Sequence, residues 1–413
     1  MSWEYKTLGE VGTVARGKSK HRPRNDESLY GGAYPFVQTG DVKHSGLYLT
    51  DYSQTYNEKG LAQSKLWPED TLCITIAANI ADTAILGMPA CFPDSILGFI
   101  PDEEKSDVRF VKYCFDLLQI NIQKMSQGST QDNLSLDKLD KIQFSFPQIA
   151  EQKKIAAVLS ALDDKIALNK KMNQKLEAMA KRLYDYWFVQ FDFPDENGRP
   201  YKTSGGPMTH NPTLKREIPT GWEVTRLGDL FKTNRGVSYS TPTLGTEGDG
   251  VPMINLASFS PNESYNEKGI KYYKGDYTDE KVLKPFDFVM CNTQQTAIDP
   301  QKDIIGRSML VPDIFDGDIV SSHHVNTIKL EKENLKFYLN RLFNTKFYHA
   351  YISKFANGTN ILGLIFSGVE DYMCEIPSDD LLEKFAKISL DIEKKKSKII
   401  KENQKLTALR DKL

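Results

Sequence analysis

Residues 148–187 read QIAEQKKIAAVLSALDDKIALNKKMNQKLEAMAKRLYDYW and contain neither proline nor glycine. Apolar residues recur along this stretch at alternating spacings of four and three, which is the heptad pattern of a helix that packs along another helix. The apolar stripe is as narrow as that of a coiled coil, so the helix needs a partner. The seam positions that we predict are Ile155, Leu162, Ile166, Asn173, Leu176 and Leu183.

Residues 378–413 carry a second heptad seam and can supply that partner. Its predicted positions include Phe385, Ile392, Ile399, Asn403 and Leu406. At an offset of 230 residues, Asn173 aligns with Asn403, and a polar residue on a seam fixes register at some cost in stability. We therefore predict an antiparallel intramolecular coiled coil of two helices, each roughly 55–60 Å long at ~1.5 Å per residue. The alternative is that each helix only covers its own domain.

The rest of the chain contains an internal repeat. Trp222-Glu223-Val224 repeats Trp3-Glu4-Tyr5 at an offset of 219, and Arg235-Gly236 repeats Arg16-Gly17 at the same offset. Looser matches follow in the same order. They pair Pro68 and Asp70 with Pro285 and Asp287 at an offset of 217, and Gly128 and Pro147 with Gly358 and Pro377 at an offset of 230. Ordered matches of this kind indicate a duplication whose loops have drifted.

The predicted fold class is α+β, with two similar mixed α/β domains in tandem, each followed by a long helix. Residues 189–220 are rich in Pro, Gly, Ser and Asn and are predicted to be a linker. The predicted parts are a first domain at 1–147, a central helix at 148–188, the linker at 189–220, a second domain at 221–377 and a C-terminal helix at 378–413.

Composition excludes several classes of protein. The chain has 53 Lys and Arg against 55 Asp and Glu, so overall charge does not decide whether it binds nucleic acid. Five scattered cysteines without a CxxC pair are typical of reduced thiols in the cytosol. His and Cys show no metal-ligand spacing, so we expect no metal. The most apolar region, residues 73–92, is interrupted by Asn79, Asp82 and Pro89, so we expect no membrane span and a cytoplasmic protein.

A basic segment follows the first Arg-Gly pair. Alternate residues of an extended strand share one face, so cations at every second position would line one edge that suits a phosphate backbone. The alternative is a solvated charged loop. The cations are Arg16, Lys18, Lys20, Arg22 and Arg24.

The same region, Gly12-Thr13-Val14-Ala15-Arg16-Gly17-Lys18-Ser19, also matches the string GxxxxGK[ST] of a P-loop. A P-loop needs a buried strand before it and a helix after it. Residues 20–26 read KHRPRND and do not favour a helix. Nucleotide binding is therefore kept only as an alternative, beside a purely structural coiled-coil scaffold.

Other polar residues cluster where the two halves align. Asn and Gln can bond adenine bidentately, and Arg can do the same with guanine, so these positions are candidate base contacts, although each of them can equally be an ordinary loop residue. The candidates are Gln38, Thr39 and Asn79 in the first half, and Arg235, Tyr239, Asn255, Asn292, Gln294, Gln295, His323 and His324 in the second.

Several strings resemble recurrent stretches of one known family, the specificity subunits of type I restriction–modification systems. They include Gly128-Ser129-Thr130-Gln131, Leu183-Tyr184-Asp185-Tyr186-Trp187-Phe188 with Phe191-Asp192-Phe193-Pro194, and Ser204-Gly205-Gly206 with Lys215-Arg216-Glu217-Ile218-Pro219-Thr220-Gly221-Trp222. The resemblance covers the whole chain. The second copy departs from it at Pro377-Ser378-Asp379-Asp380, which lacks the Glu151-Gln152 pair of the first.

The resemblance implies a DNA-recognition subunit without catalytic residues. Each domain would read one half of a bipartite, asymmetric site in double-stranded DNA. The helices would set the spacing and dock two adenine methyltransferase subunits, and motor-nuclease subunits could join. S-adenosylmethionine, ATP and Mg would belong to those partners. The chain itself has no [DN]PP[FYW] tetrapeptide of an adenine methyltransferase, which agrees with this expectation.

Overall fold

The computed structural model describes residues 3–76, 81–126, 136–260, 265–295 and 303–413. The chain divides into two compact units. One comprises Met1–Leu168 with Lys405–Leu413, and the other comprises Asn169–Gln404. Both unit boundaries fall inside the long helices α6 (Ile149–Tyr184) and α10 (Asp379–Arg410).

The described residues of the first domain form two sheets and a short ladder. One sheet has the order β2-β10-β7-β8-β4, a second has the order β5-β3-β9-β6, and β1 pairs with β11. The strands are β1 (Glu4–Lys6), β2 (Gly12–Arg16), β3 (Tyr30–Phe36), β4 (Tyr48–Leu49), β5 (Gln54–Tyr56), β6 (Leu66–Trp67), β7 (Leu72–Thr75), β8 (Thr83–Leu86), β9 (Ala90–Cys91), β10 (Ile96–Pro101) and β11 (Phe144–Phe146). The helices are α1 (Leu8–Val11), α2 (Thr39–His44), α3 (Glu58–Ala62), α4 (Val108–Ser126) and α5 (Leu136–Leu139).

The central strand β7 explains why the sequence around residue 73 is so apolar. Leu72 and Ile74 belong to one apolar cluster, and Cys73 belongs to another. Both faces of this strand are therefore buried, and a strand buried on both faces is an almost continuous apolar run.

The second domain repeats this architecture. Its sheets have the orders β15-β24-β20-β22 and β16-β18-β17-β23-β19; β14 pairs with β27, and a further sheet has the order β21-β26-β25. The strands are β14 (Glu223–Arg226), β15 (Phe231–Arg235), β16 (Leu244–Gly245), β17 (Val251–Ile254), β18 (Lys271–Tyr273), β19 (Val282–Leu283), β20 (Phe288–Cys291), β21 (Thr293–Gln295), β22 (Ser308–Leu310), β23 (Ile319–Ser321), β24 (Val325–Leu330), β25 (Ala356–Asn357), β26 (Ile361–Leu364) and β27 (Met373–Ile376). The helices are α7 (Leu335–Phe343), α8 (Lys346–Ile352) and α9 (Ser367–Glu370).

Strand register confirms the internal repeat. Glu4 pairs with Phe146 in the first domain and Glu223 pairs with Ile376 in the second, which reproduces the predicted offsets of 219 and 230. Strands β2 and β15 are likewise related by 219. The predicted match of Asp70 with Asp287 was wrong by one residue. The turns before β7 and β20 place Asp70 and Phe286 at equivalent left-handed positions, with φ of 62° and 65°. The offset there is 216 rather than the predicted 217.

The repeated Arg-Gly pair marks a close approach of two backbones. Gly17 donates its N–H to the Ile96 carbonyl, and Gly236 donates to Val325. A Cβ at Gly17 would lie 2.2 Å from the Pro93 carbonyl oxygen, and one at Gly236 would lie 2.1 Å from that of Ser321. Only glycine fits at either position, so the repeat of this residue has a structural cause.

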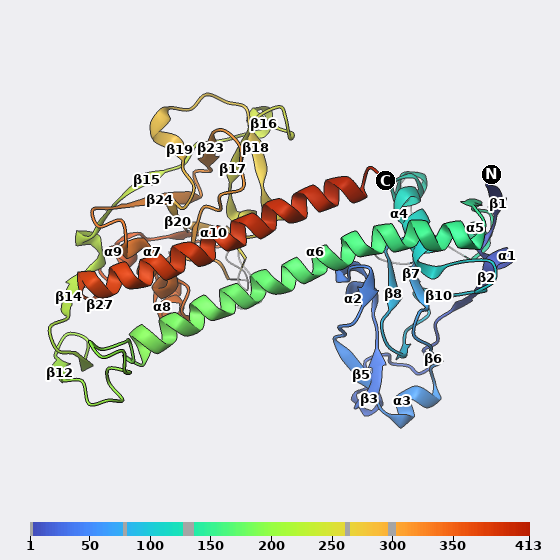
Figure 1. Ribbon diagram of the computed structural model, residues 1–413, viewed down its shortest axis with the longest axis horizontal. Helices are drawn as coiled ribbons and strands as arrows, with labels where there is room; N and C mark the ends of the chain where they lie inside the picture. The colour runs from blue at the N-terminus through green and yellow to red at the C-terminus, as the bar shows by residue number, and fades with distance from the viewer. Residues whose placement is uncertain (1–2, 77–80, 127–135, 261–264, 296–302) are drawn as a thin grey trace. The chain divides into compact units, whose positions relative to one another are not determined.

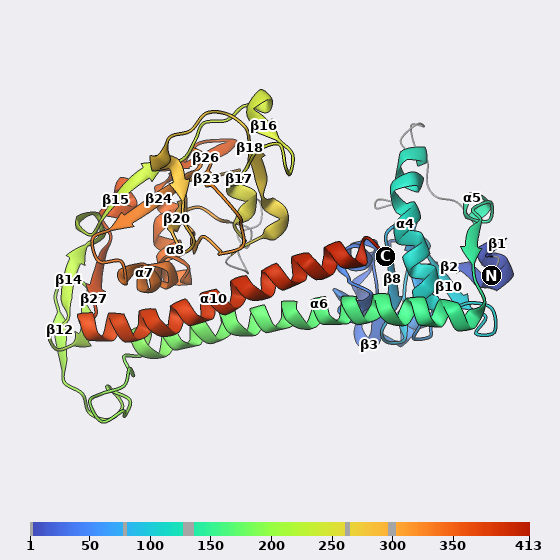
Figure 2. The same ribbon diagram turned by 45° about the horizontal axis from the view of Figure 1, so that its top comes forward.

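The two long helices form the predicted antiparallel pair. Figures 1 and 2 show α10 beside the C-terminal half of α6. Asn169 bonds Asn403, whereas the aromatic ring of Trp187 lies 5.8 Å from that of Phe385, so the two helices run in opposite directions. Every predicted seam side chain is buried or half-buried.

The first turns of each long helix also cover the domain that precedes it. Ala156 and Leu159 of α6 lie in the apolar core of the first domain. Phe385 and Ala386 of α10 lie in the core of the second, together with Tyr184 at the end of α6. Each long helix therefore covers its own domain with its first turns and pairs with the other helix further along. The two predicted alternatives, a coiled coil and a helix that covers its own domain, are thus compatible.

The segment 189–220, predicted as a linker, is ordered and packs against the core of the second domain. Phe191 and Phe193 are buried in the core that contains α7. Asp192 accepts hydrogen bonds from the N–H and hydroxyl of Thr203 at 2.8 and 2.6 Å, and these bonds lower the pKa of its carboxyl. A hairpin of β12 (Met208–Asn211) and β13 (Arg216–Pro219) follows. The buried aromatic residues Phe191 and Phe193, rather than the loop-like composition, determine how this segment folds.

None of the helices in the described part of the chain combines the length and the apolar character of a membrane span. Over the same residues, His, Cys, Asp and Glu side chains do not assemble in groups of three or more that could hold a metal ion.

Candidate DNA interface and helix pair

The helix pair contains buried polar contacts that fix its register. Asn169, only 5% exposed, donates from Nδ2 to the Oδ1 of Asn403 and the Oε2 of Glu402, both at 2.9 Å. The sequence aligns Asn173 with Asn403 as equivalent positions. In the antiparallel pair Asn403 instead meets Asn169, and Asn173 approaches the Lys396 carbonyl at 3.5 Å.

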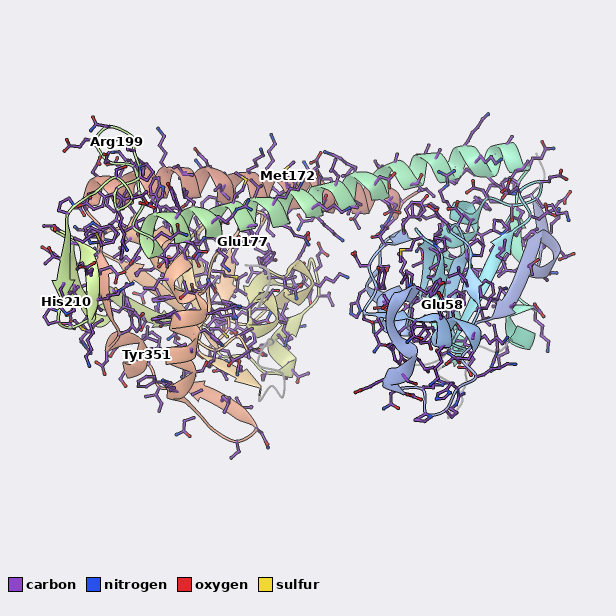
Figure 3. All side chains as sticks on the ribbon, turned by 90° about the horizontal axis from the view of Figure 1, so that it is seen from below. Glu58, Met172, Glu177, Arg199, His210 and Tyr351 are labelled. Atoms are coloured by element: carbon purple, nitrogen blue, oxygen red, sulfur yellow. The ribbon has the colours of Figure 1, made fainter. Side chains whose placement is uncertain are left out.

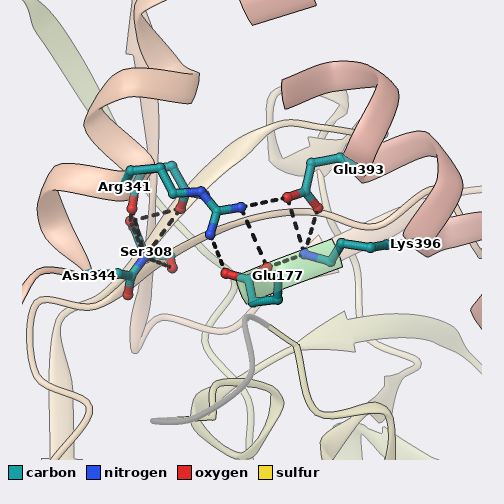
Figure 4. A network of polar contacts seen from close by, with 7 residues as sticks. Glu177, Ser308, Arg341, Asn344, Glu393 and Lys396 are labelled. Carbon is teal, nitrogen blue, oxygen red and sulfur yellow. Dashed lines mark hydrogen bonds and ion pairs between the residues drawn. The ribbon is translucent and has the colours of Figure 1, made fainter. Parts of the chain in front are cut away.

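A buried charge cluster joins the helix pair to α7 of the second domain. We define it as Glu177 of α6, Arg341 of α7, and Glu393 and Lys396 of α10 (Figure 4). Arg341 contacts both carboxylates and lies 3.0 Å from that of Glu393. Lys396 contacts the same two carboxylates, at 2.5 Å for Glu177 and 3.0 Å for Glu393. Sequence reasoning missed this cluster, because Arg341 is about 160 residues from Glu177 along the chain.

The cluster holds Glu177 ionised. Burial by itself raises the pKa of this carboxyl, but Arg341 and Lys396 outweigh burial, so the pKa lies well below its usual range. Figure 3 labels Glu177 on α6 together with Met172, a neighbour on the same helix that is 39% exposed.

The basic segment, residues 16–24, departs from the prediction in its secondary structure. Strand β2 ends at Arg16, and the next residues form an extended loop rather than a strand. The loop is held through its backbone, because Lys18 N–H bonds Phe92 and the Lys18 carbonyl accepts from the Ser64 hydroxyl at 2.7 Å. Alternation nevertheless persists, since Gly17 and Ser19 are buried while Arg16, Lys18 and Lys20 are exposed.

Two of the five cations are already paired. Arg24 lies 2.6 Å from the carboxylate of Asp94 and Arg22 lies 3.8 Å from it. Within the described residues, Arg16, Lys18 and Lys20 form no ion pair. The prediction of five equivalent cations on one edge is thereby corrected to three, with a separate arginine pair neutralised in part by Asp94.

The P-loop alternative does not fit this geometry. Residues Gly12–Arg16 of the motif form strand β2, and its remaining residues lie in the extended loop. The motif is followed by a loop and then a single 3-10 turn at Glu27–Leu29, not by a helix whose N-terminus could bind phosphate. Residues 12–19 therefore match the sequence GxxxxGK[ST] but are not followed by the helix that a P-loop requires.

Four predicted residues of the second half come together at one end of its sheets. Arg235 closes β15, and its Nε donates to the His323 carbonyl at 2.8 Å. The Tyr239 ring lies 5.5 and 6.3 Å from the rings of His323 and His324. Lys271 of β18, which the sequence did not single out, lies over the Tyr239 ring at 5.2 Å. We call residues 322–324 the histidine turn.

Asn292 lies beside this turn, and its side-chain amide already forms hydrogen bonds within the protein. Its Nδ2 donates to the His323 carbonyl at 3.2 Å and to the Oδ1 of Asn326 at 2.7 Å, and its own Oδ1 accepts from Thr293. Its amide therefore positions the turn, and a base contact at Asn292 would require these bonds to be exchanged.

Two of the predicted base contacts, Asn255 and Gln294, are buried, and the prediction is corrected for both. Asn255 is 3% exposed, and its amide bonds the carbonyls of Met253 and Gly269 and the N–H of Ala257. Gln294 is 4% exposed and accepts from two backbone N–H groups at residues 304 and 305. Both side chains stabilise loops and are unavailable to a ligand.

The remaining candidates are placed as follows. Gln38 precedes α2, and its side-chain amide donates to Gln54 at 2.7 Å. Thr39, the first residue of α2, is half-buried. Gln295 ends β21. Asn79 lies outside the described residues.

An apolar groove runs along the helix pair in the second unit. Its lining residues are Met179, Arg182, Leu183, Tyr186, Ile388 and Ile392. Met179 is 50% exposed, and Tyr186 and Ile388 are each 39% exposed. Side chains of this kind in contact with water on both helices are typical of a surface that binds another protein.

The comparisons with known proteins agree with this architecture. The family model described as "Type I restriction modification DNA specificity domain" matches residues 1–178. The chain is 26% identical over 389 residues to the type I restriction enzyme MjaIX specificity subunit of Methanocaldococcus jannaschii, which covers 93% of this chain and 85% of that relative. It is 27% identical over 202 residues to the HindI specificity subunit of Haemophilus influenzae, covering 46% and 41% of the two chains.

A solved structure shares the fold. The S subunit of a type I restriction–modification system from M. genitalium aligns with a TM-score of 0.57 at 14% identity and covers 100% of this chain and 95% of that one. The repeated domains and the helix pair are thus the fold of that S subunit, and residues 1–178 match a DNA-specificity domain of restriction–modification systems. The predicted resemblance to the specificity subunits of type I systems is thereby confirmed, over residues 1–178 by the family model and over nearly the whole chain by the MjaIX relative.

Proposed function

We propose that this chain is the recognition subunit of a type I complex and that each domain reads one half of a bipartite, asymmetric DNA site. The observation that carries the proposal is the match in strand register between two domains whose exposed polar residues differ. The first domain presents Arg16, Lys18 and Lys20, whereas the second presents Arg235 and Lys271 beside the histidine turn. One scaffold with two sets of side chains suits two different half-sites.

In this proposal the chain supplies recognition, and methylation and cleavage occur in cytoplasmic partner subunits. S-adenosylmethionine, ATP and Mg would be bound by those partners. Two methyltransferase subunits would dock on the helix pair, and motor-nuclease subunits could join. The groove around Met179, Tyr186 and Ile388 supports docking, because an apolar helix of a partner would remove these side chains from water.

The direct test is the set of methylated adenines in cells that carry the whole system with or without this chain. We expect one bipartite motif to be methylated only when the chain is present. Full methylation in its absence would contradict the proposal.

The helix pair is proposed to set the gap between the half-sites, and its length can be changed without changing its seam. A copy of residues 162–168 inserted before Asn169, with a copy of residues 404–410 inserted after Asn403, adds one heptad to each helix. The pair grows by ~10.5 Å, which is ~3 base pairs at 3.4 Å each. We expect the unspecified gap in the methylated motif to grow accordingly. An unchanged gap would show that the helices do not set it, and the same insertion in loop 196–198 is the control.

A further inference from the structure

The histidine turn gathers cationic and titratable groups from several strands of the second domain. The imidazole rings of His323 and His324 lie 3.8 Å apart. Arg235, at the end of β15, donates to the His323 carbonyl. Lys271, at the start of β18, lies over the Tyr239 ring, and that ring packs against both imidazoles. These groups are far apart in sequence and converge only because the β15–β24 and β17–β23 pairings bring their strand ends together.

The hydrogen-bonding capacity of this cluster is not used up by the protein. The Nδ1 atoms of both histidines are shielded from water, and neither has a hydrogen-bond partner among the described residues. Arg235 uses Nε on the His323 carbonyl, while the rest of its exposed guanidinium makes no ion pair in the described part of the chain. Lys271 is exposed as well and faces an aromatic ring, not a carboxylate. An anion is the ligand that the exposed Arg235 and Lys271 lack, and both nitrogens of an imidazole become donors once the ring is protonated.

We propose that the histidine turn, with Arg235 and Lys271, binds a backbone phosphate of DNA and takes up a proton as it does so. The inference rests on the proposed function and deepens it, because it assigns the second domain a pH-dependent contact. His324 is the group that gains the proton, and Arg235 and Lys271 supply the permanent charge.

The coupling between phosphate and proton follows from electrostatics. In the free protein, burial lowers the pKa of His324, and His323, Arg235 and Lys271 lower it further by repulsion. A phosphate beside the ring offsets that repulsion and accepts the N–H, so it favours the imidazolium. The bound pKa is then higher than the free one. Affinity therefore rises as pH falls through the interval between the two values and is independent of pH outside it.

The equivalent turn of the first domain lacks this chemistry. Lys18 bonds the Phe92 carbonyl as Val237 bonds that of Ser321, so Asp94 occupies the position of His323. Asp94 is an anion already paired with Arg22 and Arg24. A pH-dependent contact of this kind is expected from the second domain alone.

The experiment uses the complete chain with its methyltransferase subunits and a duplex that carries the methylated motif. Binding is measured by titration calorimetry in two buffers of different ionisation enthalpy between pH 5.5 and 8, which counts the protons taken up. The wild-type complex should take up about one proton within this range, and its affinity should rise by at most about ten-fold per pH unit. In His324→Gln this uptake should disappear, while His210→Gln, at an exposed histidine in hairpin β12–β13, should retain it.

Lys271→Ala gives a second test that does not disturb a buried group. Loss of this cation should move the pH midpoint of proton uptake upward and reduce the salt slope by about 0.9. Equal uptake in wild type and His324→Gln, or no uptake in wild type, would overturn the inference while DNA binding itself persists. Absence of DNA binding in every variant at every pH would instead overturn the proposed function and the inference with it.

Discussion

The two domains share a backbone and differ in the residues that it carries. Strands β2-β10-β7-β8 of the first domain have the same order as β15-β24-β20-β22 of the second, and the turns after β9 and β23 occupy equivalent positions. One turn carries Asp94 paired with two arginines, and the other carries His323 and His324 beside Arg235. Buried strands tolerate little change, because a shift of one residue exchanges the two faces of a strand. An exposed turn carries no such constraint, so the surfaces of a duplicated pair diverge first.

The domains are also anchored to the helix pair in different ways. In the first unit, the Tyr113 hydroxyl of α4 donates to Asp163 of α6 at 2.7 Å, and Arg410 of α10 contacts the same carboxylate at 2.7 Å. In the second, Arg341 of α7 contacts Glu393, which stands 230 residues after Asp163. The acidic position is thus common to both halves. Its partner is the neutral phenol of Tyr113 in the first half and the cation of Arg341 in the second. Because Arg341 is charged, it also pairs with the carboxylate of Glu177.

The largest expected effect concerns this second anchor. Arg341→Met leaves Glu177 and Glu393 buried with only Lys396 between them, and loss of one partner in a buried ionic cluster costs about 3–5 kcal/mol of folding free energy. We expect a lower urea midpoint, with hydrogen exchange increased in the second unit. Arg199→Met, at an exposed arginine paired with Asp195, is the matched control.

Acid should reproduce part of this effect. The lowered pKa of Glu177 means that its stabilising contribution is present above the ordinary glutamate value and is lost as pH falls through the folded one. Replacement of all four cluster residues by apolar ones should recover most of the stability. A wild-type urea midpoint for Arg341→Met would show that the second anchor does not stabilise the fold.

The second prediction addresses the basic surface of the first domain. Replacement of Arg16, Lys18 and Lys20 by alanine should lower the salt slope of DNA binding by up to about 2.7, since each phosphate contact contributes about 0.9. Binding at several salt concentrations checks it, with Lys105→Ala as the control because Lys105 already pairs with Asp102. An unchanged slope would place the phosphate contacts elsewhere.

The third prediction tests whether Asp94 weakens DNA binding by the first domain. Asp94→Ser releases Arg22 and Arg24, so the salt slope should steepen by up to about 1.8 and affinity at low salt should rise. Asp102→Ser frees one lysine away from the basic segment and is the matched control. If both variants behave alike, the arginine pair does not face DNA.

The smallest expected effect is at the first anchor. Tyr113→Phe removes one hydrogen bond to a carboxylate that keeps Arg410, so we expect a loss of about 1.5 kcal/mol. Urea unfolding of the first unit measures it. A loss as large as that of Arg341→Met would erase the contrast between the two anchors.

Some features of the fold and site could be predicted because they are written in local periodicity. The heptad seams predicted both long helices, and the repeated Arg-Gly pair located β2 and β15 within the duplication. The basic alternation predicted which side chains are exposed but not that the strand ends at Arg16. Asn255 and Gln294 were misassigned because an amide that caps a buried turn and an amide that reads a base look alike in sequence.

The sequence by itself determined the repeat, the two long helices, their antiparallel pairing and the resemblance to type I specificity subunits, because each rests on spacing along the chain. Tertiary structure alone decided which polar residues meet. It joined Arg341 to Glu177 and Glu393, seated Asn403 against Asn169, and brought Lys271 to the histidine turn. Such contacts depend on strand register and helix crossing over many residues, and charge or amide identity at one position carries no record of its partner.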